Sequence, residues 1–179
     1  MKNSFPASRL PAWRKPVMIG ILALLAACGK EAVQAVVMEP DAGTACALDG
    51  MVLKDYPGPK AQIHYKEGAP EFFCDIVELF GMLLAPEQKR PVAAVFVQDM
   101  GKADWAHPSG HWIDAKSAYY VVGSRKHGSM GATFATFASL PEAESFVKKE
   151  GGTIHRFEQV TLDMVDQPKK DGSQGNRMH

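Results

Sequence analysis

The sequence lacks the features that would indicate a membrane-spanning helix, a nucleic-acid-binding surface or a common hydrolytic site. Its longest apolar run, Pro16–Ala27, is 12 residues long, whereas a helix needs roughly 20 residues to cross a bilayer. Lys and Arg together number 20, as do Asp and Glu, so no basic excess would attract nucleic acid. The Gly-x-Ser-x-Gly, phosphate-loop and His-Glu-x-x-His patterns are absent, and the enzymes that depend on them are not indicated.

The short apolar run has the form of a bacterial export signal. Arg9, Arg14 and Lys15 precede it, and Leu-Ala-Ala ends it directly before Cys28. This ending is typical of lipoprotein signals, in which the cysteine sulfur takes a diacylglycerol and becomes the first residue of the mature chain. We therefore expect a lipoprotein signal peptide at residues 1–27 and lipidation at Cys28. The alternatives are a cleaved signal beside a coincidental cysteine, and an anchor that is not cleaved.

The mature chain would be a mildly acidic exported protein. Removing residues 1–27 from the 179 leaves 152, enough for one domain or for two small domains that share a core. The signal holds four of the 20 basic residues and no acidic one, so the remainder has a net charge of −4. We expect a monomer with no nucleic-acid partner. Gly29 follows Cys28, where Asp would signal inner-membrane retention, and this favours an anchor on the periplasmic face of the outer membrane.

After lipidation of Cys28, two cysteines remain for other roles, Cys46 and Cys74. In an oxidising compartment two cysteines most simply form one disulfide. The alternative is that both are kept as thiols because they bind a ligand. Composition by itself favours the disulfide.

The spacing of apolar residues predicts two segments with the same order of elements, strand–strand–helix–strand. In the first unit, residues 46–100, the expected elements are strands at Met51–Lys54 and Ala61–Lys66, a helix at Phe72–Leu84 and a strand at Val92–Gln98. In the second unit, residues 115–165, they are strands at Ala118–Val122 and Ala132–Ala138, a helix from Pro141 and a closing strand at Thr153–Gln159. The sequence therefore predicts an α+β fold of two small repeated ββαβ units, each with a helix packed on a short sheet.

Three further segments complete the predicted organisation. Residues 28–45 are mostly small and weakly apolar, and we expect a lipidated tether there. Residues 101–114, which contain Pro108 and Gly110, are expected to connect the two units. Residues 166–179 have almost nothing to bury, which predicts a disordered tail.

Sulfur-containing side chains form the most distinctive candidate site. Two methionines lie in glycine-bearing loops instead of helical stripes: Met51, five residues after Cys46, and Met130, in the stretch Gly-Ser-Met-Gly. Thiolates and thioethers are soft ligands, which favour Cu(I) over harder divalent ions. A thioether also cannot be lost to a disulfide in an oxidising compartment. From the residues alone, ordinary packing of the methionines and a Cys46–Cys74 disulfide remain the alternatives.

Several separated motifs lie between residues 46 and 160. They are Cys46-x-x-Asp-Gly-Met51, Tyr56-Pro-Gly-Pro-Lys-Ala-Gln-Ile63, Phe72-Phe-Cys-Asp75, Trp112-Ile-x-Ala115, Ala118-Tyr-Tyr-Val-Val-Gly-Ser124, Met130-Gly131 with the strand that follows, and Ala143…Phe146…Gly151-Gly152. In these motifs the chain resembles the NosL family, the nitrous oxide reductase accessory lipoproteins. Because the motifs cover nearly the whole expected folded part, the resemblance is specific.

The resemblance implies a Cu(I)-binding periplasmic lipoprotein, not an enzyme, that supplies copper for the maturation of nitrous oxide reductase in denitrification. Its partner would be that reductase or its membrane-bound maturation complex. The implied fold is akin to that of organomercurial lyase. The family pattern assigns Cys46, Met51 and Met130 to the metal. Cys74 is a further candidate ligand, and so is His127, from the same loop as Met130.

One departure from the family pattern affects the expected ligands. Many relatives have Cys-x-x-Cys-Gly-Met, and Asp49 stands here in place of the second cysteine, so Cys46 is the one thiol of this loop. Two other functions remain open from the sequence. One is a thiol enzyme of the organomercurial-lyase type that uses Cys46, Cys74 and Asp75. The other is a structural lipoprotein with a Cys46–Cys74 disulfide and no metal.

Overall fold

Residues 35–166 are described by the structure, which is a computed structural model. The predicted signal peptide at 1–27, the lipidation of Cys28 and all but the first residue of the predicted tail at 166–179 lie outside the described residues. Within residues 35–166 no helix is long and apolar enough to cross a membrane.

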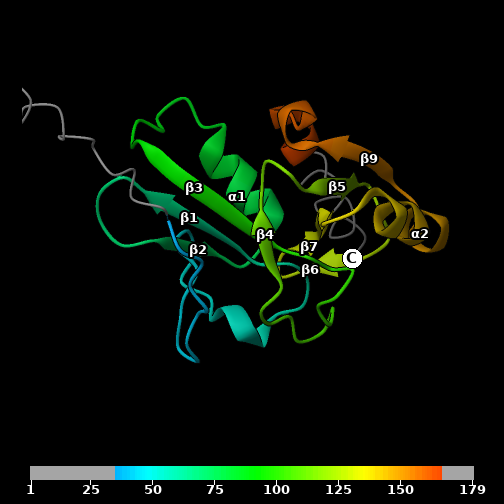
Figure 1. Ribbon diagram of the computed structural model, residues 1–179, viewed down its shortest axis with the longest axis horizontal. Helices are drawn as coiled ribbons and strands as arrows, with labels where there is room; N and C mark the ends of the chain where they lie inside the picture. Colours follow the sequence, from blue (N-terminus) through cyan, green and yellow to red (C-terminus); the bar gives the residue numbers. More distant parts are fainter. Residues whose placement is uncertain (1–34, 167–179) are drawn as a thin grey trace, which may run out of the picture. The chain divides into compact units, whose positions relative to one another are not determined.

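A four-stranded antiparallel sheet organises the first half of the described chain (Figure 1). Its strands, in sheet order, are β2 (Glu71–Phe73), β1 (Ala61–Tyr65), β3 (Val92–Gln98) and β4 (Trp112–Asp114). Helix α1 (Ile76–Leu83) follows β2 and lies against β1 and β2. Asp75 begins this helix, because its side chain accepts a 2.8 Å hydrogen bond from the Val77 N–H, the favoured role of Asp at a helix N-cap.

A three-stranded antiparallel sheet organises the second half. Its strands, in sheet order, are β8 (Ala135–Phe137), β5 (Tyr119–Val122) and β9 (Thr153–Arg156), and helix α2 (Leu140–Glu150) joins β8 to β9. The two halves share one connectivity. In each, the first strand lies between the second and third and is antiparallel to both, and the helix joins the second strand to the third. The fold is therefore α+β with two ββαβ repeats, as the sequence predicts.

In the first repeat the predicted strands Ala61–Lys66 and Val92–Gln98 are present as β1 and β3, but the remaining strand is not where the sequence predicts it. The segment Met51–Lys54, predicted as a strand, overlaps a 3-10 helix, η1 (Leu53–Asp55). The second strand, β2, occupies the start of the predicted helix Phe72–Leu84. The helix begins later than predicted because Phe73 pairs with β1 in the sheet, and because Asp75 then caps α1.

The second repeat also differs from the prediction in its details. The predicted strand Ala132–Ala138 is divided: β7 (Gly131–Ala132) pairs with β6 (His127–Gly128) in a separate hairpin, and β8 pairs with β5. The closing strand ends at β9, and the 3-10 helix η2 (Phe157–Gln159) follows it. The connection 101–114 contributes strand β4, which pairs with β3. These short strands have too few residues for apolar alternation to reveal them.

The two repeats share one aromatic core. The ring of Phe80, on α1, lies 5.1 Å from that of Tyr120 on β5 and 5.3 Å from that of Phe157. Tyr120 is fully buried, and its hydroxyl donates a 2.6 Å hydrogen bond to the Ala115 carbonyl. Because α1 covers residues of both repeats, neither repeat buries its apolar face alone.

Part of the predicted tether is fastened to the first sheet. The Met38 N–H donates to Gln62 Oε1 at 3.0 Å, and Gln62 Nε2 donates to the Met38 carbonyl at 2.9 Å. The Glu39 carboxylate accepts from the Gly110 N–H and from Trp112 Nε1. Gln62 lies fully buried within β1, and a buried amide needs such partners.

Candidate metal centre

Two thiols converge at the edge of the first repeat. Cys46 lies in a tight loop, in which its N–H donates to the Met51 carbonyl at 2.8 Å and its carbonyl accepts from the Gly50 N–H at 3.0 Å. Cys74 lies between β2 and α1. The thiols are 4% and 0% exposed, and both are free. The disulfide that composition favours is therefore absent from the structure.

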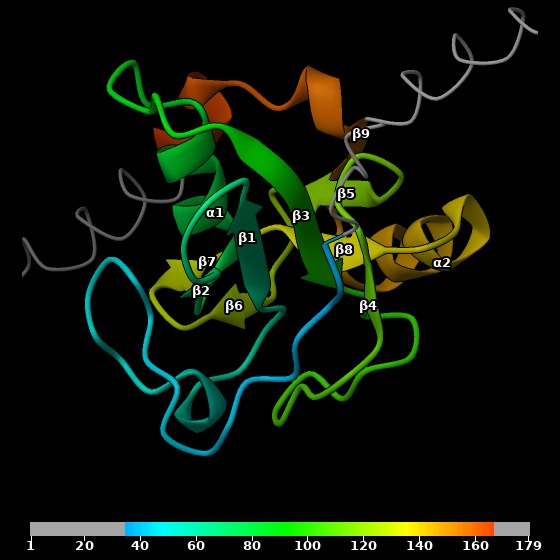
Figure 2. The same ribbon diagram turned by 60° about the vertical axis from the view of Figure 1, so that its left-hand side comes forward.

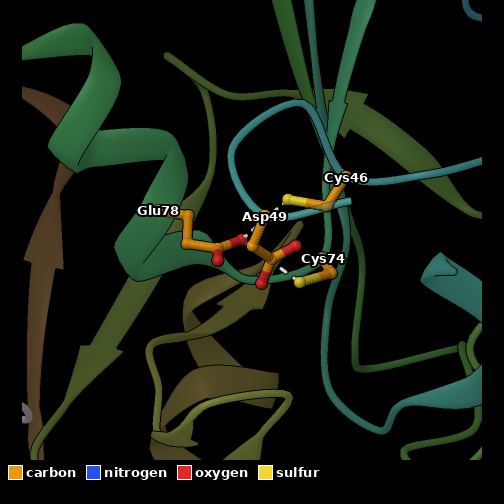
Figure 3. A group of neighbouring side chains, drawn as sticks. All are labelled: Cys46, Asp49, Cys74 and Glu78. Carbon is orange, nitrogen blue, oxygen red and sulfur yellow. Dashed lines mark hydrogen bonds between the residues drawn. The ribbon is translucent and has the colours of Figure 1, made fainter. Parts of the chain in front are cut away.

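Two carboxylates join these thiols. The potential ligand atoms of Cys46, Asp49, Cys74 and Glu78 all lie within 4.8 Å of one another, and their side chains point toward one another (Figure 3). We call these four residues the thiol–carboxylate group. Four groups that can each become negative repel one another at this distance. Protons or a cation are therefore needed to hold them together.

Glu78 is the residue that connects the two thiols. It lies in the first turn of α1, and its Oε2 accepts hydrogen bonds of 3.2 Å from Cys46 Sγ and of 3.2 Å from Cys74 Sγ. Burial raises the pKa of Glu78 to about 7, because a half-buried site disfavours the charged carboxylate. Because both thiols donate to the same carboxylate oxygen, Glu78 holds the two sulfur atoms close together while both are protonated.

The two thiols differ in acidity because the Cys74 thiol can donate a hydrogen bond to the Cys46 thiolate once Cys46 has lost its proton. The contact from Cys74 lowers the pKa of Cys46, whereas the same contact and burial raise the pKa of Cys74. These two pKa values describe the coupled pair of thiols. The first proton is lost readily, and the second is retained because its loss would place two negative charges side by side. A bound cation would remove the obstacle to the second ionisation.

The methionines proposed from the sequence occupy different positions relative to this group. Met51 is half-buried and packs against the buried cluster formed by Cys46, Leu53 and Cys74. Met130 lies in the turn between β6 and β7 and is 67% exposed. The preceding residue, Ser129, places its Oγ 3.2 Å from Cys74 Sγ. The second repeat thus reaches the thiols through this turn.

His127 is separate from the thiol–carboxylate group. It lies on β6 with an exposed side chain, and its carbonyl accepts a 2.9 Å hydrogen bond from Trp105 Nε1. Among residues 35–166, the group of potential ligands around the two thiols contains no histidine.

Two buried charged residues, Lys60 and Asp75, lie next to Cys74. Lys60 is 2% exposed, and its Nζ donates to the carbonyls of Cys74 at 3.1 Å and Pro57 at 3.0 Å. Burial lowers the pKa of Lys60, and the nearby acidic groups oppose this shift. Burial also raises the pKa of Asp75 to about 6. The Asp75 carboxylate accepts from Val77 and Thr133, so it is occupied as a helix cap.

Sequence reasoning missed Glu78, Lys60 and Ser129. Glu78 has a signal that could have found it, since it is the one charged residue in the apolar helix α1 and follows Cys74 by four positions. Cys74 directly precedes the N-cap Asp75, and Glu78 lies in the first turn of α1, so both lie at the start of the helix. Lys60 and Ser129 reach Cys74 only through tertiary contacts, and their sequence neighbours give no signal.

The centre combines soft sulfur donors with harder carboxylate oxygens. The sulfur atoms of Cys46 and Cys74 lie close together, Met51 packs against the cluster that contains them, and Met130 lies on the adjacent turn. Such a set suits a soft monovalent ion better than a hard divalent one. Among known families, the model of the NosL family matches residues 37–165 of the chain.

The chain belongs to the NosL family. Two NosL relatives, each named a copper-binding lipoprotein, match most of it. The relative from Stutzerimonas stutzeri is 43% identical over 141 residues, which are 76% of this chain and 73% of the relative. The relative from Achromobacter cycloclastes is 41% identical over 163 residues, which are 86% of this chain and 82% of the relative.

A solved NosL structure has the same fold. The crystal structure of the copper chaperone NosL from Shewanella denitrificans superposes with a TM-score of 0.67 at 37% identity. The match covers 73% of this chain and 97% of the solved chain. The two ββαβ repeats described above are therefore the NosL fold.

Proposed function

We propose that this NosL-family chain binds Cu(I) and delivers it for the maturation of nitrous oxide reductase, without catalysing a reaction. The observation that carries the proposal is the pair of buried free thiols that share Glu78, with Met51 packed beside them. The relatives that match over most of the chain are named copper-binding lipoproteins, and the solved relative is titled a copper chaperone.

The ligands we propose are the thiolates of Cys46 and Cys74 and the thioethers of Met51 and Met130. Soft sulfur donors select Cu(I), and the ion neutralises the second thiolate, which is otherwise hard to form beside the first. Glu78 and Asp49 are harder donors. We assign them to holding the thiols and the 46–51 loop in place, since Asp49 Oδ1 accepts a 2.9 Å hydrogen bond from the Met51 N–H.

Transfer would proceed by ligand exchange. A soft ligand of the acceptor protein forms a bond to Cu(I) as the bond to exposed Met130 breaks, and the thiolates follow. Copper remains Cu(I) throughout, and the two thiols recover protons from solvent. A site with few ligands, one of which is exposed, is suited to an ion that must be released. No electron donor or acceptor is required.

We propose that the chain acts at the periplasmic surface of a membrane, tethered by lipid on Cys28. The Leu-Ala-Ala-Cys28 signal and the lipoprotein names of both relatives support the anchor. The Gly29 that follows Cys28 supports the outer membrane over the inner one. The docking partner would be nitrous oxide reductase or its membrane-bound maturation complex.

The test is an anaerobic titration of the reduced, acylated protein in detergent with Cu(I), against a colorimetric Cu(I) chelator. We expect one ion per chain, lost in Cys46→Ser and Cys74→Ser and weakened in Met51→Ala. Loaded protein should pass copper to copper-free nitrous oxide reductase, measured as recovered activity. Failure of the reduced wild-type protein to take up Cu(I) would refute the proposal.

A further inference from the structure

The hairpin that carries Met130 is fastened to the first repeat at one buried side chain. Asp75 is 2% exposed, and its Oδ1 accepts 2.8 Å from the Val77 N–H and 2.6 Å from Thr133 Oγ1. Val77 belongs to α1, and Thr133 directly follows β7. One carboxylate therefore joins the start of α1 to the β6–β7 hairpin, which lies beside it in Figures 1 and 2.

The hairpin approaches Asp75 so closely that only glycine fits at position 128. A Cβ at Gly128 would overlap Asp75 Oδ2 and would lie 3.0 Å from Thr133 atoms. A Cβ at Gly58, on the other side, would lie 3.0 Å from the Gly128 Cα. Any side chain at position 128 must therefore displace the hairpin or the carboxylate. We call the contact among Asp75, Thr133 and Gly128 the hairpin clasp.

The clasp determines where the next two residues lie. Ser129 places its Oγ 3.2 Å from Cys74 Sγ and 3.5 Å from Asp75 Oδ2. Met130 follows at the exposed tip of the hairpin. Since Cys74 and Asp75 are adjacent in the chain and Asp75 is held as the helix cap, the position of the hairpin is fixed relative to the Cys74 thiol.

We propose that the hairpin clasp is a positioning device that holds the Met130 thioether within reach of a Cu(I) ion on Cys46 and Cys74. The inference rests on the proposed function. A ligand on a fixed neighbouring turn acts at a high effective concentration, whereas the same ligand on a displaced turn adds little. Asp75 and Thr133 act through Met130 and do not touch the ion.

The test compares Cu(I) affinity in single and double variants of the acylated protein in detergent. Gly128→Ala should displace the hairpin and weaken Cu(I) binding about 10- to 100-fold, as changes to supporting groups of a metal site do. Met130→Ala should weaken it to the same level, and the double variant should be no weaker than Met130→Ala. X-ray absorption should show one fewer sulfur neighbour of copper in Gly128→Ala and in Met130→Ala.

Two further variants distinguish an effect on the hairpin from a general loss of folding. Thr133→Val keeps the shape of the side chain and removes one hydrogen bond, so it should weaken binding less, and only while Met130 is present. Gly81→Ala is the matched control, since its Cβ would meet nothing closer than Val165 at 3.9 Å. It should bind Cu(I) as the wild type does.

The outcomes separate the inference from the proposed function. If Met130→Ala weakens binding while Gly128→Ala and Thr133→Val do not, the clasp has no positioning role. Losses that add in the double variant would overturn the inference as well, because independent sites add. If Met130→Ala binds as wild type does, the inference fails while a thiol-based copper site stands. If the wild type binds no Cu(I), the proposed function itself fails.

Discussion

The ammonium group of Lys60 donates a 3.1 Å hydrogen bond to the carbonyl oxygen of Cys74, directly behind a candidate copper ligand. Lys60 is 2% exposed, and a buried ammonium is costly unless negative groups offset it. Here the acidic groups of Cys46, Cys74, Asp75 and Glu78 all interact with its charge. Lys60 is thus the internal counter-charge of the thiol–carboxylate group.

Replacing Lys60 should weaken Cu(I) binding. Two thiolates and one Cu(I) carry a net negative charge, and Lys60→Met removes the buried positive charge that offsets it. We expect an affinity about 10-fold lower, measured by chelator competition. Lys54→Met is the matched control, because Lys54 is exposed, and it should leave the affinity unchanged. Equal affinities in both variants would show that Lys60 has a structural role only.

Copper should protect the thiols from oxidation. The sulfur atoms of Cys46 and Cys74 lie in one group of atoms within 4.8 Å, so diamide can oxidise the apo pair to a disulfide with a modest movement of the 46–51 loop. A count of free thiols after denaturation should fall from two to zero in the apo protein. It should stay at two in the copper-loaded protein. A loaded protein that loses its thiols at the apo rate would contradict a site made of these two cysteines.

Removing the Gln62 amide should loosen the segment that leads to the lipid anchor. Gln62→Leu loses both hydrogen bonds to Met38 and the 2.7 Å contact with His64. Because buried polar groups are left unpaired, we expect the free energy of unfolding to fall by about 2–3 kcal/mol. Urea denaturation measures this loss, and limited proteolysis should cut near Met38 sooner. A variant as stable as wild type would show that water replaces these contacts at no cost.

His64 should make the folded chain less stable as the pH falls below neutrality, whereas the raised pKa values of Glu78 and Asp75 act in the opposite direction. Burial lowers the pKa of His64 from its ordinary value of 6.5. The unfolded chain therefore binds a proton at His64 before the folded chain does. The contribution is fully present above pH 6.5 and is lost as the pH falls through the lowered value. Urea unfolding at pH 7.5 and pH 5.5 isolates His64 when the wild type is compared with His64→Gln. Acidification should destabilise the wild type relative to the variant, and an identical pH dependence of the two would contradict this assignment.

The sequence allows the fold class to be predicted because local signals agree with the final structure in most elements. Val92–Gln98 and the Tyr-Val strand near Tyr119 are apolar enough to require burial, and Pro141 and Gly151 bracket the second helix. Strand β2 was not predicted because its three residues are too few to show a periodic pattern of apolar residues. Its state depends on pairing with β1, ten residues earlier in the chain, and not on its own composition.

For the candidate site, too, some features can be predicted from the sequence and others cannot. The soft character of Cys46, Cys74, Met51 and Met130 follows from residue type, and the loop positions of Met51 and Met130 follow from neighbouring glycines. The residues that support these side chains cannot be predicted in this way. Glu78 meets Cys46 across 32 positions of sequence, and Thr133 meets Asp75 across 58. The first contact forms when the first repeat folds, and the second forms only when the two repeats pack on a shared core.

By itself, the sequence predicts an exported, sulfur-bearing α+β chain, because signal pattern, composition and apolar spacing are local properties. The tertiary structure decides that Cys46 and Cys74 are free thiols and not a disulfide, with Glu78 between them. It also decides that the Met130 turn lies against Cys74 through Asp75 and Gly128. The physical reason is that hydrogen bonds and steric limits between distant segments are set by packing, which no stretch of sequence contains alone.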